Sequence, residues 1–111
     1  MLKIGEFSVL STISISMLRH YDKLGLLVPV HIDEINGYRY YDEKQLTLAN
    51  RIVAMKEMGF GLEEIKSALQ ATFEEREEQL QTKLLMKKKE LQIIQNQIFK
   101  LEETMKLENQ E

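Results

Sequence analysis

The chain contains no cysteine and no tryptophan, and it has a single proline, Pro29, among 111 residues. Without cysteine it has no disulfide, no thiolate nucleophile and no cysteine-ligated zinc site. Its purely apolar runs are only a few residues long, and its first residues lack the apolar core of a signal peptide. We therefore expect neither a membrane span nor a secreted protein, and we place the chain in the cytoplasm.

Residue types that carry catalysis are also sparse. There are two histidines, His20 and His31, and the adjacent carboxylates Glu63 and Glu64 would point in different directions on a helix, which makes a poor acid–base pair. The glycines in Gly59-Phe60-Gly61 follow a helical pattern and lack the third glycine of a nucleotide-binding loop. We expect no enzymatic activity, no catalytic residue, no metal site and no cofactor.

The charge balance argues against a nucleic-acid partner at first sight. The chain has 15 basic and 18 acidic residues, a net charge of -3, whereas nucleic-acid binders usually carry a basic footprint. Contacts with phosphates are short-range at physiological salt, so local convergence of basic side chains could still support binding. Length and a 43% hydrophobic content fit one small globular domain with an appendage.

The stretch Ser14–Leu24 predicts a short helix with a polar outer face. Four side chains recur at i, i+3, i+4 and i+7 and so share one side of this helix: Ser16, Arg19, His20 and Lys23. Such a row suits hydrogen bonding to base edges and phosphates in a DNA major groove, which admits one helix. The alternative is an ordinary solvated face. Ser14 is a suitable N-cap, and Gly25 ends the helix.

Two elements flank this helix. The spacing of Ile4, Phe7 and Leu10 predicts a first short helix that faces a core and is joined to Ser14–Leu24 by a turn. From Val30 to Tyr41 apolar and polar residues alternate around Asn36-Gly37, which predicts a β-hairpin with a tight turn. A two-stranded wing beside a helix-turn-helix pair is typical of DNA-binding proteins.

The wing carries the next candidate contacts. We place Tyr38 and Arg39 at its tip, where they would reach a phosphate backbone; packing and surface solvation are the alternative for both. For Tyr40 and Tyr41 we expect packing.

Two further helices follow. Asp42 and Gln45 form a capping-box pattern that opens a helix running to Met58, with a buried stripe of Leu46, Ala49, Ile52 and Val53. Lys56 continues this stripe, so it either contacts a phosphate or interacts with the helix C-terminus. A fourth, short helix is expected over Leu62–Leu69.

From Thr72 onward the sequence stays helical and contains no glycine. A heptad assignment places seven apolar residues and Lys87 at the eight core positions; the seven are Leu80, Leu84, Leu91, Ile94, Ile98, Leu101 and Met105. This predicts a dimerisation helix over residues 71–111, after a DNA-binding domain over residues 1–70. A homodimer is the economical partner, and Lys87 could fix its register.

Four blocks of this chain together resemble the MerR family of bacterial transcription regulators. The blocks are Ile4-Gly5-Glu6; Met17-Leu18-Arg19-His20-Tyr21-Asp22-Lys23-Leu24-Gly25-Leu26-Leu27 with Pro29; Asn36-Gly37-Tyr38-Arg39-Tyr40-Tyr41; and Met58-Gly59-Phe60-Gly61-Leu62-Glu63-Glu64-Ile65. The resemblance implies a mainly α fold: a winged helix-turn-helix with a small β-hairpin wing, then a long helix that pairs antiparallel with its two-fold mate.

Carried over position by position, the resemblance places DNA contacts at Arg19, at its neighbour and at Lys56, as well as at the wing residues Tyr38 and Arg39. The chain departs from the family pattern at three positions. His20 stands where tyrosine is usual, Thr12 where glycine or asparagine is usual in the turn, and Gly61 where a helix cap such as serine is usual.

The resemblance also implies a mechanism. Family members bind promoter DNA whose two recognition elements are too far apart, and they bend and untwist it so that RNA polymerase engages. Metal- and redox-sensing members use cysteines, which this chain lacks, and multidrug-type members carry a ligand domain after the long helix. We expect a short regulator or part of a longer one, and its effector stays open. The alternative function is a protein-interaction module that uses the coiled coil and binds no DNA.

Overall fold

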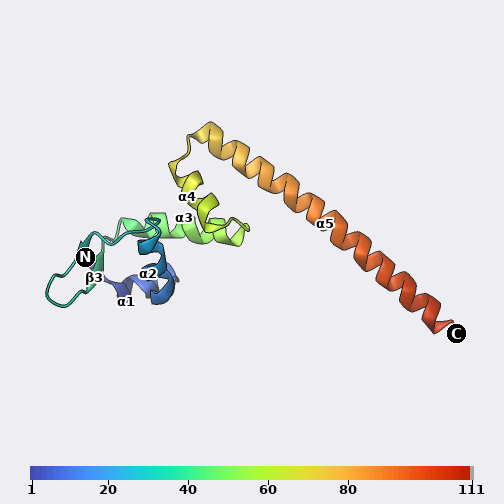
Figure 1. Ribbon diagram of the computed structural model, residues 1–111, viewed down its shortest axis with the longest axis horizontal. Helices are drawn as coiled ribbons and strands as arrows, with labels where there is room; N and C mark the ends of the chain where they lie inside the picture. The colour runs from blue at the N-terminus through green and yellow to red at the C-terminus, as the bar shows by residue number, and fades with distance from the viewer. Residues whose placement is uncertain (111) are drawn as a thin grey trace. The chain divides into compact units, whose positions relative to one another are not determined.

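The computed structural model describes residues 1–110, most of which are helical (Figure 1). The chain divides into two compact units, residues 1–69 and residues from 70 onward. In order, the described elements are β1 (Leu2–Lys3), α1 (Ile4–Ser11), α2 (Ile15–Lys23), β2 (His31–Ile32), β3 (Arg39–Tyr41), α3 (Gln45–Glu57), α4 (Leu62–Gln70) and α5 (Phe73–Asn109). The fold is mainly α, as predicted, with a small sheet and a long final helix. None of the helices in the described chain is long and apolar enough to cross a membrane.

Hydrogen bonds of two serine hydroxyls stabilise the turn between α1 and α2. The Ser8 hydroxyl donates to the Ile13 carbonyl at 2.6 Å, and the Ile13 amide donates to the Ser11 hydroxyl oxygen at 3.2 Å. Ser11 is therefore buried, and Leu10, predicted to face the core, is 57% exposed instead. The prediction for Leu10 was wrong because the chain turns immediately after α1, and the serine hydroxyl is needed inside that turn.

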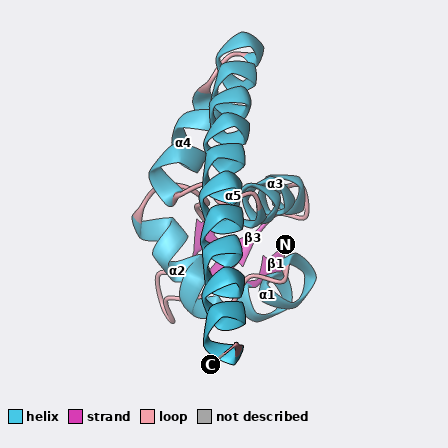
Figure 2. Cartoon of the chain, turned by 90° about the vertical axis from the view of Figure 1, so that its right-hand side faces the viewer, coloured by secondary structure: helices cyan, strands magenta, loops and turns pink. Residues whose placement is uncertain are grey.

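The sheet has three antiparallel strands rather than two, in the order β1-β3-β2. Figure 2 shows β1 and β3 in magenta. β3 lies in the centre, with Leu2 opposite Tyr41 on one side and Ile32 opposite Arg39 on the other. β1 was not predicted from the sequence because a strand of two residues shows no alternation to detect. As a result, the wing is paired with β1, the strand that directly precedes α1.

The loop of the wing is longer than the tight turn that Asn36-Gly37 predicted. The Gly37 amide donates to the Asp33 carbonyl at 2.8 Å, and the Asp33 carboxylate accepts from the Ile35 amide at 2.8 Å. Of the predicted pair, only Gly37 has a positive φ, at 73°. The tip is therefore formed by residues 34–37, and Arg39 lies within β3, not at the tip.

A stacked aromatic pair lies at the centre of the first unit. The rings of Phe7 in α1 and Tyr41 in β3 are parallel to within 21°, with centroids 4.4 Å apart, and both residues are fully buried. Each of the other three helices of this unit also contributes a large, fully buried side chain: Leu18 from α2, Ile52 from α3 and Ile65 from α4. Tyr41 thus packs, as predicted.

Helix α3 begins later than predicted, and its buried stripe agrees with the predicted one at Ala49 and Ile52 but not at its edges. It starts at Gln45, whose side chain accepts from the Asp42 amide at 2.9 Å across a preceding turn. Its buried residues are Ala49, Ile52 and Met55, whereas Leu46 and Val53 are only partly buried. Because burial continues through Met55, the neighbouring Lys56 is exposed to solvent and does not continue the stripe.

Helix α5 is one continuous helix of 37 residues, shown in yellow to red in Figure 1. Its N-cap is Thr72, whose hydroxyl accepts from the Glu75 amide at 3.2 Å, as the capping pattern predicted. Leu80 is partly buried, and the other six predicted dimerisation residues are exposed. Their pairing stays a prediction.

Thr12 generates a stability prediction. It has φ 64° and ψ 15°, the left-handed region, which costs a β-branched residue about 1–2 kcal/mol. Asparagine tolerates this region better and lacks the extra flexibility of glycine in the unfolded chain. We expect Thr12→Asn to raise the free energy of unfolding by about 0.5–1 kcal/mol in urea titrations. The exposed helical Thr47 provides the control: Thr47→Asn should give no gain, and an equal gain at both positions would contradict the strain argument.

Tyr41 generates a pH prediction. Its buried hydroxyl has no hydrogen-bond partner within the described chain, and burial raises its pKa above the ordinary 10.0, with Asp22 adding to the rise and Arg39 opposing it. Above about pH 10 the unfolded chain ionises this phenol while the folded chain keeps it neutral, so stability falls as pH rises. Tyr41→Phe should raise the free energy of unfolding at pH 7 by about 1 kcal/mol and flatten the alkaline loss. Tyr40→Phe, at a partly buried ring, is the control that should do neither.

Candidate nucleic-acid interface

The outer face of α2 carries the predicted polar row. Ser16, Arg19, His20 and Lys23 are all exposed, and together with Met17 they line one surface hollow of about 460 Å³, here called the α2 hollow. The spacing in the sequence therefore predicted correctly which side chains share this face. No carboxylate lines the hollow, so its charged lining is entirely basic.

Both ends of α2 are fixed. At the start, the Ser14 hydroxyl oxygen accepts from the Met17 amide at 3.1 Å, as predicted for an N-cap. At the end, Gly25 has a φ of 70°, and its amide donates to the Asp22 carbonyl at 3.0 Å. The ammonium of Lys66 in α4 donates to the Leu24 carbonyl at 2.9 Å, a favourable cation at a helix C-terminus.

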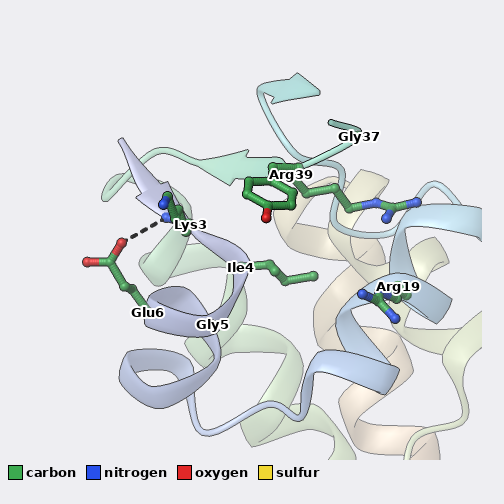
Figure 3. Close-up of a pocket in the computed structure, with 8 residues that line it drawn as sticks. Lys3, Ile4, Gly5, Glu6, Arg19, Gly37 and Arg39 are labelled. Carbon is green, nitrogen blue, oxygen red and sulfur yellow. Dashed lines mark hydrogen bonds between the residues drawn. The ribbon is translucent and has the colours of Figure 1, made fainter. Parts of the chain in front are cut away.

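A second hollow, of about 510 Å³, lies where the start of α1, the helix α2 and the wing meet (Figure 3). We call it the α1–wing hollow; it is lined by Lys3, Ile4, Gly5, Glu6, Arg19, Gly37, Tyr38 and Arg39. In Figure 3 the Ile4 side chain lies between Lys3 on one side and Arg19 and Arg39 on the other. Arg19 lines both hollows, so the two form adjoining parts of one surface.

Lys3 is a basic residue of this surface that was not predicted from the sequence. It belongs to β1, the strand that pairs with β3 through Tyr40, and its ammonium lies 5.8 Å from the centroid of the Tyr38 ring. This is within the range of a cation–π contact. The signal was absent from the sequence because Lys3 is far from the wing along the chain and reaches it only through the strand pairing.

The basic side chains converge even though the chain is acidic overall. The α1–wing hollow is lined by three basic residues, Lys3, Arg19 and Arg39, and by a single acidic one, Glu6. The Glu6 carboxylate already accepts from the Lys3 amide at 3.2 Å. Guanidinium groups bind phosphate oxygens through two parallel hydrogen bonds, and a lysine ammonium binds them as a point charge. The surface therefore has the chemistry of an anion-binding site.

Arg39 also has a structural role. Its Nε donates to the Asp22 carboxylate at 3.1 Å, with the two side chains 30% and 18% exposed. This ion pair joins β3 to the last turn of α2, which sets the wing against the outer face of that helix. The predicted contact residue is thus partly engaged by its own chain, through one of its three guanidinium nitrogens.

The predicted DNA contacts Tyr38 and Lys56 lie on different parts of the surface. Tyr38 is 54% exposed and lines the α1–wing hollow, whereas Lys56, on α3, lines neither hollow. The structure brings six of the seven predicted DNA contacts together and leaves Lys56 separate. In the described chain no group of three or more histidine, aspartate or glutamate side chains is arranged to hold a metal ion.

Comparison with known proteins identifies the family of this chain. The sequence pattern described as MerR HTH family regulatory protein matches residues 2–72. The multidrug-efflux transporter 1 regulator of Bacillus subtilis (strain 168) is 41% identical over 88 residues, which cover 73% of this chain and 32% of the relative. The chain therefore spans about a third of the length of such curated relatives.

Two solved structures share the fold. The N-terminal part of the Bacillus subtilis multidrug transporter activator, MtaN, superimposes with a TM-score of 0.83 at 30% identity, over 95% of this chain and 98% of MtaN. EcmrR in its complex with DNA has a TM-score of 0.86 at 27% identity, over 98% of this chain and 40% of EcmrR. The chain belongs to the MerR family of helix-turn-helix regulatory proteins.

Proposed function

We propose that this chain is a sequence-specific DNA-binding regulator of transcription. The observation that carries the proposal is the convergence of basic side chains from β1, α2 and β3 on the surface formed by the α2 hollow and the α1–wing hollow. Apart from the ion pair of Arg39 with Asp22, clustered cations repel one another and do not stabilise the fold. A polyanion supplies the missing counter-charge.

The two hollows suggest different tasks on a duplex. The α2 row, Ser16, Arg19, His20 and Lys23, belongs to a helix that a major groove admits, and it provides donors for base edges. Contacts with phosphates position a protein without reading sequence, and Lys3, Tyr38 and Arg39 beside the wing are suited to them. Lys56, outside both hollows, would reach a phosphate elsewhere along the backbone.

Binding to promoter DNA as a homodimer completes the proposal. The exposed apolar stripe of α5 needs a partner, and a second copy offers the same stripe. A dimer that holds two reading surfaces at a fixed distance can bend and untwist a promoter with an overlong spacer, at a cost of about 1–6 kcal/mol for a strong bend. RNA polymerase would then engage the deformed promoter. EcmrR, one structural relative, was solved on DNA in a complex named EcmrR-RPo.

Selection from randomised duplex DNA tests the proposal. We expect enrichment of a two-fold sequence with two half-sites, because two α2 helices read equivalent base pairs. Arg19→Ala, at the residue shared by both hollows, should abolish the enrichment, while Lys100→Ala on α5 should preserve it. Failure of the unaltered chain to enrich any sequence would contradict DNA recognition and favour the protein-interaction alternative.

The salt dependence of binding tests the contacts with phosphates. The logarithm of the affinity should fall with the logarithm of salt concentration, with a slope of about −0.9 for each phosphate contacted. Lys3→Ala and Arg39→Ala should each reduce this slope by about 0.9, measured by fluorescence anisotropy on the selected duplex.

Asp22→Asn is the matched control for Arg39. It weakens the same ion pair but removes no cation, so the slope should be retained. An equal loss of slope in Asp22→Asn and Arg39→Ala would mean that Arg39 acts only by holding the wing against α2.

A further inference from the structure

The ammonium of Lys66 binds a helix other than its own. Lys66 belongs to α4 and is partly buried, and its Nζ donates to the Leu24 carbonyl, 42 residues away in the sequence, at 2.9 Å. A lysine side chain normally extends into water, and holding it in one place costs conformational entropy. Lys66 lines neither hollow of the candidate interface, so it is not one of the cations that face a ligand there. Its hydrogen bond acts on the protein itself.

The acceptor lies at the point where α2 ends. Leu24 is the C-cap residue of α2, and the last carbonyls of a helix have no partner within that helix. Next to it, Gly25 turns the chain with a φ of 70°, and a Cβ at that position would lie 3.7 Å from the Lys66 ammonium. A cation at this end also interacts favourably with the helix dipole. The Lys66 ammonium thus caps α2 from another helix and lies against the bend at Gly25.

We propose that Lys66 is a positioning residue for base recognition, because its bond to the Leu24 carbonyl fixes the direction of the last turn of α2. This inference rests on the DNA binding of the proposed function. The side chains placed by that turn are His20 and Lys23, which lie within one turn of the C-cap and line the α2 hollow. The opposite end of α2 is held separately, by the N-cap at Ser14.

Two other elements hold the last turn of α2. Arg39 of β3 binds the Asp22 side chain at 3.1 Å, which joins the turn to the wing. Lys66 binds the main chain two residues further on, which joins the same turn to α4. Helix α4 is itself anchored in the core of the first unit through the buried residues Ile65 and Ala68. Loss of the Lys66 bond leaves the end of α2 attached to the wing alone.

The length of α2 makes its direction important for reading bases. A helix of nine residues is about 13 Å long, so a tilt of about 5° at its start moves its end by about 1 Å. Hydrogen bonds tolerate a smaller range of donor–acceptor distances, about 2.7–3.2 Å. Long basic side chains on phosphates act largely as point charges and adapt to such a shift. A misdirected α2 therefore loses contacts with bases while contacts with phosphates persist.

Removal of the ammonium tests the proposal. Lys66→Met keeps an apolar stem and removes the donor. On the duplex that the unaltered chain selects, its affinity should fall on the order of tenfold, comparable with the loss of one base contact. Its affinity for a scrambled duplex and the dependence of both affinities on salt should stay unchanged, measured by fluorescence anisotropy. Lys66→Arg retains a donor for the Leu24 carbonyl and should recover most of the lost affinity.

A matched control separates positioning from stability. Ala68→Gly weakens the same helix at a buried position and leaves Lys66 in place. At a temperature where both variants are folded, Ala68→Gly should bind the selected duplex as the unaltered chain does. An equal loss in Ala68→Gly would mean that Lys66 acts only through the stability of α4. Equal losses of Lys66→Met on both duplexes, with a weaker salt dependence, would mean that Lys66 contacts a phosphate. Either result overturns the proposal.

Hydrogen exchange in the free protein tests the positioning without DNA. The amides of Gly25 and Leu26 donate to carbonyls in the last turn of α2, and the Leu18 amide donates to a carbonyl at its start. Lys66→Met should speed exchange of the first two on the order of fivefold relative to Leu18. An unchanged ratio overturns the proposal. A raised ratio in a chain that selects no duplex overturns the proposed function instead, and confirms the hold of Lys66 on α2.

Discussion

The stacked pair of Phe7 and Tyr41 is the contact on which the arrangement of the first unit depends. It joins α1 to β3, and β3 is the central strand, paired with β1 on one side and β2 on the other. The wing cannot move without moving the ring of Tyr41, which is fully buried. The ion pair from Arg39 to Asp22 adds a second connection, from the same strand to α2. Arg39 and Tyr41, two residues of β3, thus hold the wing against both helices of the helix-turn-helix.

Electrostatics in this protein operates locally. The net charge of -3 argues against a DNA partner. Strand pairing and helix packing nevertheless place Lys3, Arg19 and Arg39 around one hollow. At physiological salt, charges interact over roughly 8 Å, so the acidic residues elsewhere affect this surface weakly. Fold geometry, more than composition, determines the field that a ligand meets. The same holds for α5, where blocks of opposite charge alternate along one helix.

Periodicity revealed the helices and the exposed face of α2, because the outward row depends only on the pitch of one helix. Features that depend on contacts between distant segments were not predictable in this way. β1 is too short to show alternation, so Lys3 was missed, and the burial of Ser11 in place of Leu10 follows from hydrogen bonds inside the turn. The pattern Asn36-Gly37 correctly indicated a turn in the wing, but the Asp33 carboxylate extends it into a longer loop. Lys56 left its predicted stripe because burial in α3 passes to Met55.

The length of α5 has a consequence for the DNA that such a dimer could serve. At 1.5 Å per residue, a helix of 37 residues is about 55 Å long. In an antiparallel pair, moving the two-fold axis by half a heptad changes the separation of the two helix starts by about 10 Å, which is the rise of about three base pairs. An antiparallel dimer of such helices would therefore change the separation of its two helix starts only in steps, each comparable in length to a few base pairs of DNA.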